Sequence, residues 1–174
     1  MRALVVYESM FGNTQHVAEA IAEGLRERFE VELREVGHAS EADLEGLDLL
    51  VVGGPIHAWS MTREGTRKGA HDQAEGAAIV STGIGIREFL AQLHDANPDA
   101  PPAAATFDTA IRTRWFPVGS AAKPAARQLG KHGYSLIAKP EHFHVADTRG
   151  PLIEGELERA RAWASELATR ARKS

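Results

Sequence analysis

The chain has 174 residues, of which 43% are hydrophobic and 25% charged, with a formal net charge of −4. This length and balance predict one globular domain over residues 1–174 and give no electrostatic footprint for binding nucleic acid. Cysteine is absent, which excludes disulfides, thiolate metal sites and cysteine nucleophiles. No apolar run approaches the roughly 20 residues that span a bilayer. Because a strand-like run begins almost at residue 1, we expect no signal peptide and a cytoplasmic protein.

Strand-like and helix-like segments alternate along the chain. In the helix-like segments apolar residues recur every three or four positions, as Val17, Ile21 and Leu25 do, whereas the strand-like segments are short apolar or alternating runs. In chain order we predict a strand at 2–7, a helix at 13–28, an edge strand at 29–36, a polar turn from Ser40, a buried strand at 47–53, a helix from Thr82 or Gly85 to about Leu93, a strand at 103–108, a helix at 121–132, a last strand at 134–138 and 142–145 interrupted at Pro140, and a helix at 154–172.

Residues 54–81 give mixed patterns. A connection of this length is usually functional or contains further structure, and a strand at 77–81 is the weaker option. Repeated strand–helix units force right-handed crossovers, so we expect an α/β fold with a parallel sheet and helices on both faces.

The turn after the first strand reads Ser9-Met-Phe-Gly-Asn-Thr14 and leads into the first helix. A strand, a short polar turn and a helix aim backbone N–H groups at a phosphate. Ser9 and Thr14 add hydroxyl donors, and Gly12 allows close approach of the backbone. The turn has no basic residue, and the chain has no P-loop or three-glycine dinucleotide motif, so a monophosphate fits better than a triphosphate. An ordinary turn with a helix cap is the alternative.

This turn resembles the phosphate loop of the flavodoxins, whose pattern is S/T-x-T-G-N-T and which holds the terminal phosphate of FMN. The resemblance implies a flavodoxin-like three-layer sandwich with a five-stranded parallel sheet in the order 2-1-3-4-5, and an FMN site beside the switch point between strands one and three. The residues predicted to hold the phosphate are Ser9, Met10, Phe11, Gly12, Asn13 and Thr14.

A second loop, from Gly54 to Met61, follows the central strand where the flavin ring is expected. It resembles the T-P-T-R-F-G-N-M loop of flavodoxin-like quinone reductases, whose phosphate loop commonly reads Y-Y-S-M-Y-G. Trp59 either stacks on the ring or covers the edge of the core, and His57 either donates to the ring or is an ordinary loop residue. The residues of this loop predicted to contact the cofactor are Pro55, Ile56, His57, Ala58 and Trp59.

A third loop follows the strand at 103–108, where flavodoxins contact the other face of the flavin. Its sequence departs from the acidic, Gly/Tyr-rich pattern of that family, so the residue on the second face stays undetermined. We predict cofactor contacts from Phe107, Asp108 and Thr109, with Ile111 as a further candidate. Asp108 has no visible carboxylate partner, so acid–base catalysis has no support.

Basic residues follow the second and third loops and predict a positive rim around the flavin. Such a rim attracts anionic reductants such as NAD(P)H and favours a two-electron reductase over a single-electron carrier. Glu64 and Asp72 partly cancel it. The basic residues are Arg63, Arg67, Lys68, Arg112 and Arg114.

The leading hypothesis is an FMN-binding redox protein that transfers electrons through the flavin. Its partners would be a redox protein, or NAD(P)H and a small acceptor. The alternatives are an NAD(P)H-dependent quinone reductase, a specialised oxidase with one partner, and a non-redox binding module with a degraded flavin pocket. His142 and His144 share one strand face but have no third ligand in view, so we predict no metal site. Enzymatic activity, oligomeric state, donor and acceptor stay open.

Overall fold

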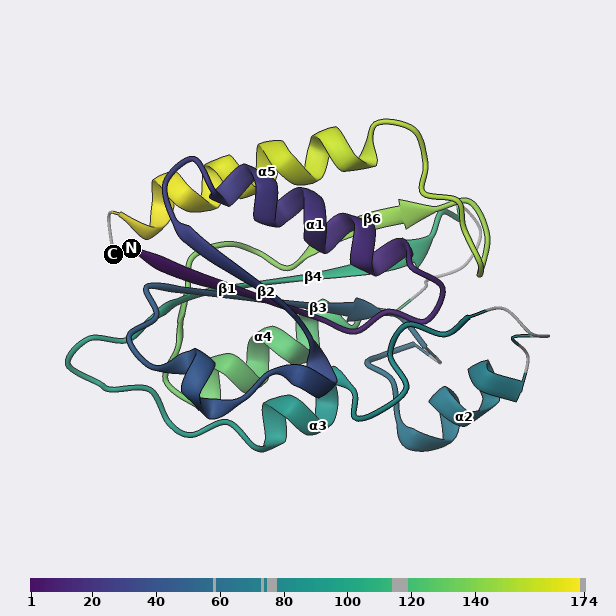
Figure 1. Cartoon of the computed structure of the whole chain (residues 1–174), viewed down its shortest axis with the longest axis horizontal. Helices are drawn as coiled ribbons and strands as arrows, with labels where there is room; N and C mark the ends of the chain where they lie inside the picture. Colours follow the sequence, from purple (N-terminus) through teal and green to yellow (C-terminus); the bar gives the residue numbers. More distant parts are fainter. Residues whose placement is uncertain (58, 73, 75–77, 114–118, 173–174) are drawn as a thin grey trace.

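One parallel β-sheet lies at the centre of the molecule, between two layers of helices (Figure 1). The computed structural model describes residues 1–57, 59–72, 74, 78–113 and 119–172. No helix in these ranges is long and apolar enough to cross a membrane.

All strand pairs in the sheet are parallel, and its order is β2-β1-β3-β4-β5 with β6 also paired to β4, which confirms the predicted order. β5 pairs with the start of β4 and β6 with its end, so two short strands share the edge position. Pro140, which has no N–H for the ladder, lies between them as predicted. The strands are β1 (Arg2–Tyr7), β2 (Glu30–Glu35), β3 (Leu49–Pro55), β4 (Ala103–Ile111), β5 (Ser135–Leu136) and β6 (Glu141–Val145).

Helices α1 and α5 cover one face of the sheet, and α3 and α4 cover the other (Figure 1). α2 lies apart from both layers, beyond the carboxyl ends of the strands (Figure 1). The helices are α1 (Asn13–Leu25), α2 (Glu64–Asp72), α3 (Ile86–Ala91), α4 (Ala122–Lys131) and α5 (Glu156–Ala171), with 3-10 turns at Val36–His38 and Glu41–Leu44.

The structure corrects several predicted elements. α2 was not predicted, because Gly65 and Gly69 within nine residues lower the helix propensity of the segment. α1 ends at Leu25 instead of residue 28. β4 continues to Ile111, so Thr109 and Ile111 of the predicted third loop lie in the strand. Residues 78–81 form no strand, and Ala77 lies outside the described residues.

The central strands are buried on both faces. Successive side chains point to opposite helix layers, so Val5 and Val51 join the core under α1 and α5 while Val6 and Val52 join the core above α3 and α4. This explains why these strands read as continuous apolar runs. Because these strands are packed on both faces, the loops at the carboxyl ends of β1, β3 and β4 begin from rigid positions.

The close packing of α1 on α5 makes Gly24 a position where two effects oppose each other. A Cβ at Gly24 would lie 2.6 Å from the carbonyl oxygen of Arg161 and 2.8 Å from the Cβ of Ala164. Helix propensity favours Gly24→Ala by about 1 kcal/mol, but overpacking costs about 1–3 kcal/mol. We therefore expect Gly24→Ala to lower the unfolding free energy by about 1 kcal/mol in urea titrations.

Gly65 is the matched control because a Cβ added at this position would meet nothing within 4 Å. We expect Gly65→Ala to raise the unfolding free energy by about 0.5–1 kcal/mol. A stabilising effect of Gly24→Ala would contradict the packing of α1 on α5 described above.

Candidate functional site

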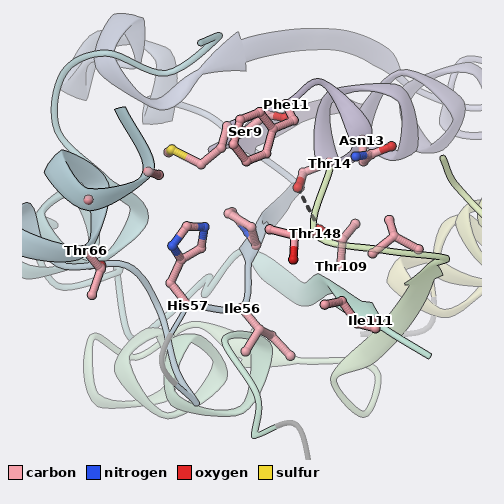
Figure 2. A pocket seen from close by; sticks show the side chains of 15 residues that line it. Ser9, Phe11, Asn13, Thr14, Ile56, His57, Thr66, Thr109, Ile111 and Thr148 are labelled. Carbon is pink, nitrogen blue, oxygen red and sulfur yellow. Dashed lines mark hydrogen bonds between the residues drawn. The ribbon is translucent and has the colours of Figure 1, made fainter. Parts of the chain in front are cut away.

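A cavity of about 390 Å³ opens at the carboxyl ends of β1, β3 and β4 (Figure 2). Its walls come from the loop before α1, the end of β3, one face of α2, the end of β4 and the connection from β6 to α5. The lining residues are Ser9, Met10, Phe11, Asn13, Thr14, Pro55, Ile56, His57, Thr66, Gly69, Ala70, Thr109, Ile111, Val145 and Thr148.

The N-terminus of α1 faces this cavity without a cap of its own. Gly12 is the N-cap residue at φ 86°, a backbone conformation that suits glycine; it has no side chain to cap the helix, and the first turn contains no acidic residue. The first helical hydrogen bond runs from the N–H of His16 to the carbonyl of Gly12, over 3.0 Å. The N–H groups of Asn13 and Thr14 therefore have no acceptor within the helix, and this arrangement favours an anion.

Short polar contacts fix the loop before α1. The N–H of Gly12 donates to the hydroxyl of Ser9 over 3.1 Å, and the N–H of Ser9 donates to the hydroxyl of Ser81 over 3.0 Å. The backbone of Ser81 in turn donates to the carbonyl of Ser9 over 2.8 Å. Ser9 is completely buried and Thr14 nearly so, so water has little access to the side chains that shape this loop.

The end of β3 supplies a mainly apolar wall. Pro55 and Ile56 line the cavity, and His57 points its ring into it beside Ile56 (Figure 2). Burial lowers the pKa of His57, so its imidazole is neutral at neutral pH and has one donor and one acceptor nitrogen.

Trp59 does not line the cavity, contrary to the prediction that it stacks on a ligand. Its side chain is 62% exposed, and its backbone is held at φ 73° in the turn closed by the paired backbone groups of His57 and Ser60. The N–H of Ser120 also donates to its carbonyl over 3.1 Å. Ala58 lies outside the described residues.

Two walls of the cavity escaped the sequence analysis. One is the face of α2 formed by Thr66, Gly69 and Ala70, whose spacing of three and one places them together on a helix. The other is formed by Val145, the last residue of β6, and by Thr148 in the connection that follows. The spacing of small residues at 66–70 is visible in the sequence. It would have indicated a shared helix face only if a helix had been predicted there.

Phe107 lies outside the cavity, contrary to prediction. It is buried and packs edge to face on Phe143 and Trp163, with ring centroids 6.1 Å and 6.5 Å apart. Thr109 and Ile111 are the residues of β4 that line the cavity, and the hydroxyl of Thr109 lies 2.8 Å from that of Thr14.

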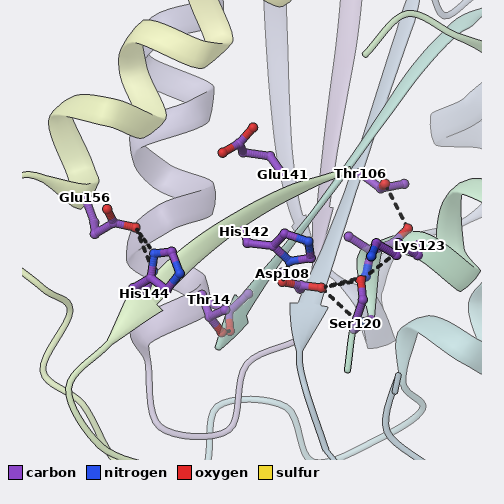
Figure 3. A network of polar contacts seen from close by, with 12 residues as sticks. Thr14, Thr106, Asp108, Ser120, Lys123, Glu141, His142, His144 and Glu156 are labelled. Atoms are coloured by element: carbon purple, nitrogen blue, oxygen red, sulfur yellow. Dashed lines mark hydrogen bonds and ion pairs between the residues drawn. The ribbon is translucent and has the colours of Figure 1, made fainter. Parts of the chain in front are cut away.

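Asp108 points to the opposite side of the sheet, where it is completely buried (Figure 3). Its carboxylate accepts from the hydroxyl of Ser120 and the N–H groups of Ala121 and Ala122, over 2.8–2.9 Å, and lies 2.6 Å from Nδ1 of His142. Asp108 therefore does not line the cavity, contrary to the predicted contact with the cofactor. Asp108 caps α4 and joins it to β6.

The hydrogen bond to Asp108 raises the pKa of His142, against the opposing effect of burial. A raised folded-state pKa stabilises the fold fully below the unfolded value of about 6.5 and loses this contribution as pH rises through the folded value. We expect the stability difference between the wild type and His142→Gln to be largest below pH 6.5 and to shrink above it, in urea unfolding at a series of pH values. A difference that does not change with pH would contradict a charged His142 in this pair.

His142 and His144 have separate carboxylate partners. Nδ1 of His144 lies 3.6 Å from Glu156, on the other side of β6 from Asp108. Within the described residues no group of three or more histidine and acidic side chains could hold a metal ion.

Arg67 is buried, so it does not belong to the predicted positive rim. Its guanidinium lies 3.0 Å from Glu88 and donates to the hydroxyl of Thr62 over 3.1 Å. Thr62 donates to Glu8 over 2.5 Å, and burial raises the pKa of this carboxyl. The network joins α2 to α3 and to the end of β1.

Three of the other basic residues predicted to form the rim are exposed on the surface. Arg63, Lys68 and Arg112 are exposed, whereas Arg114 lies outside the described residues. The positive rim therefore has fewer members than predicted.

The order of the strands and the two helix layers define a flavodoxin-like fold. Residues 4–66 match the model of the flavodoxin domain family. A flavodoxin of Aquifex aeolicus is 40% identical over 68 residues, which are 36% of this chain and 37% of that protein. The sequence match therefore spans little more than a third of this chain and of this curated relative.

Solved structures agree with the fold along the whole chain. An archaeal flavodoxin has a TM-score of 0.65 at 16% identity and covers 99% of both chains. Flavodoxin 2 from Bacillus cereus has a TM-score of 0.66 at 18% identity, over 97% of this chain and 99% of that one. A WrbA-like flavodoxin from Agrobacterium tumefaciens has a TM-score of 0.63 at 21% identity, over 99% and 98%. At these identities the likeness establishes the fold.

Proposed function

We propose that this chain binds FMN in the cavity and transfers electrons through it. The uncapped N-terminus of α1, which opens into a cavity with apolar walls, is the observation that carries this proposal. The match of residues 4–66 to the flavodoxin domain model, and the likeness of 68 residues to a flavodoxin, support it. We treat residues 1–174 as one domain for this function.

The residues present fit the two ends of FMN. At one end the first-turn N–H groups and the hydroxyls of Ser9 and Thr14 are neutral donors, and none of the described cavity-lining residues is charged. Such a set suits a single phosphate held by a helix terminus. Away from this helix terminus, Ile56 and Ile111 offer the apolar surface that a flat ring requires.

When bound, FMN supplies one- or two-electron chemistry, and the chain supplies binding, orientation and electrostatics. The first turn of α1 holds the phosphate. The neutral His57 would be available to donate a hydrogen bond to the bound cofactor or to accept one from it. We assign cofactor contact to Ser9, Met10, Phe11, Asn13, Thr14, Pro55, Ile56, His57 and Thr109 and, through its backbone, to Gly12.

The source of electrons divides the proposal into two forms. A carrier receives electrons from a redox partner protein. An NAD(P)H-dependent quinone reductase would instead bind the nicotinamide against the flavin and pass electrons to a small acceptor. The Gly54–Met61 loop resembles the corresponding loop of quinone reductases, and this resemblance is the reason to test the reductase form as well.

The test is the visible spectrum of the purified protein during titration with FMN, followed by anaerobic addition of NADPH and then dithionite. A bound flavin that bleaches with NADPH indicates a reductase. A bound flavin that responds only to dithionite indicates a carrier. Failure to bind FMN in excess contradicts the proposal and supports a non-redox module.

A further inference from the structure

Two hydroxyl groups meet at the phosphate end of the cavity. Oγ1 of Thr14, in the first turn of α1, lies 2.8 Å from Oγ1 of Thr109 near the end of β4 (Figure 2). The two residues are 2% and 6% exposed, both line the cavity, and 95 positions of sequence separate them. The contact is therefore formed by the fold and is shielded from bulk water.

The direction of this hydrogen bond decides what Thr14 offers a ligand. Each hydroxyl has one hydrogen, and the bond between them uses one of the two. If Thr14 donates to Thr109, only its lone pairs remain for the ligand, and these repel an anion. If Thr109 donates to Thr14, the hydrogen of Thr14 stays available for the anion.

Thr109 is rigidly held. It lies in register between Pro55 of β3 and Phe143 of β6, and its carbonyl accepts the N–H of Ile56 over 3.1 Å. Its branched Cβ further restricts rotation of the side chain. The hydroxyl of Thr109 is thus a fixed point against which the hydroxyl of Thr14 is oriented.

Resting on the proposed function, we propose that Thr109 is a positioning residue that donates to Thr14 and thereby directs the Thr14 hydroxyl toward the phosphate of the bound flavin. Thr109 then contributes to selectivity for FMN over riboflavin. It acts through Thr14 and has no need to touch the phosphate itself.

The test compares dissociation constants for FMN and riboflavin, measured by flavin fluorescence, in the wild type and in Thr109→Val and Thr109→Ser. We expect Thr109→Val to weaken FMN binding about five- to tenfold, as expected for one orienting hydrogen bond, and to leave riboflavin binding within about twofold. Thr109→Ser keeps the hydroxyl and should restore FMN binding. Thr109→Ala repeats the test if the valine variant does not fold.

Thr106 provides the matched control. It lies on the same strand, is 1% exposed, and donates its hydroxyl to the carbonyl of Ala122 over 3.0 Å, outside the cavity. Thr106→Val removes a buried hydroxyl from β4, so any general loosening of the strand would appear there. We expect it to leave the ratio of the FMN and riboflavin dissociation constants unchanged.

A double-mutant cycle tests whether Thr109 acts through Thr14. Once Thr14→Val has removed the oriented hydroxyl, adding Thr109→Val should cause no further loss of FMN affinity. Additive losses, or equal weakening of FMN and riboflavin in Thr109→Val, would overturn the inference. A wild type that binds FMN while Thr109→Val binds it equally well overturns the inference alone, whereas a wild type that binds neither flavin overturns the proposed function as well.

Discussion

Asp108→Ala is expected to lower the unfolding free energy by about 3 to 5 kcal/mol, the range for removing one partner of a buried, hydrogen-bonded pair. The carboxylate is fully buried and joins the first N–H groups of α4 to the imidazole of His142. Alanine would leave the helix N-terminus and the histidine without this acceptor. In a chain of this size the thermal midpoint should fall by roughly 10 °C.

Two milder variants test whether the loss of stability in Asp108→Ala comes from the loss of the cap on α4. Ser120→Ala removes one donor to Asp108 and the acceptor for the N–H of Lys123, so we expect a loss of about 1 kcal/mol. Asp108→Asn keeps an oxygen for the helix and should lie between these two variants. If Asp108→Ala unfolded within about 1 kcal/mol of the wild type, the capping role would be refuted.

Gly69→Leu is expected to block the cavity while stabilising the fold. Gly69 lines the cavity, and a Cβ added there would meet nothing within 4 Å, so a leucine side chain can enter the space that we propose for the flavin. Overfilling should weaken FMN binding by at least about 30-fold. Leucine is the better helix former, so the unfolding free energy should rise by about 0.5–1 kcal/mol. Fluorescence titration with FMN and urea unfolding measure the two effects.

Gly65→Leu separates helix propensity from occupation of the cavity. Gly65 lies one turn earlier on α2, is exposed, and does not line the cavity. We expect this variant to show the stabilisation with FMN affinity close to that of the wild type. If Gly69→Leu bound FMN as tightly as Gly65→Leu, α2 would not be a wall of the flavin site.

The order of the elements was predictable because it depends on local periodicity. Buried runs such as Leu49–Val52 and the helical spacing of Val17 and Ile21 appear directly in the sequence. The loop before α1 was found for the same reason, since strand, turn and helix follow one another within a few residues. The helix–sheet topology then placed this loop at the carboxyl edge of the sheet.

The missed features depend on contacts between distant residues. Side chains alternate along β4, and whether Asp108 or Thr109 reaches the cavity depends on which face of the strand each occupies. The partner of Asp108 is 34 positions away and that of Thr109 is 95 positions away, so no local pattern reveals either. The position of Trp59 was predicted wrongly because its turn is fixed by a residue on another loop. The N–H of Ser120 donates to the carbonyl of Trp59.

The two short strands that share one border of the sheet also bear on solubility. An exposed strand border normally offers free N–H and C=O groups to another molecule, which invites aggregation. Along β6 these groups are already engaged by α5, because Arg159 donates to the carbonyl of His142 and Glu156 accepts the N–H of His144. At the opposite border β2 carries Glu30, Glu32 and Arg34. Both borders are thus poor templates for intermolecular strand addition, and concentrated solutions of the folded protein should resist fibril formation.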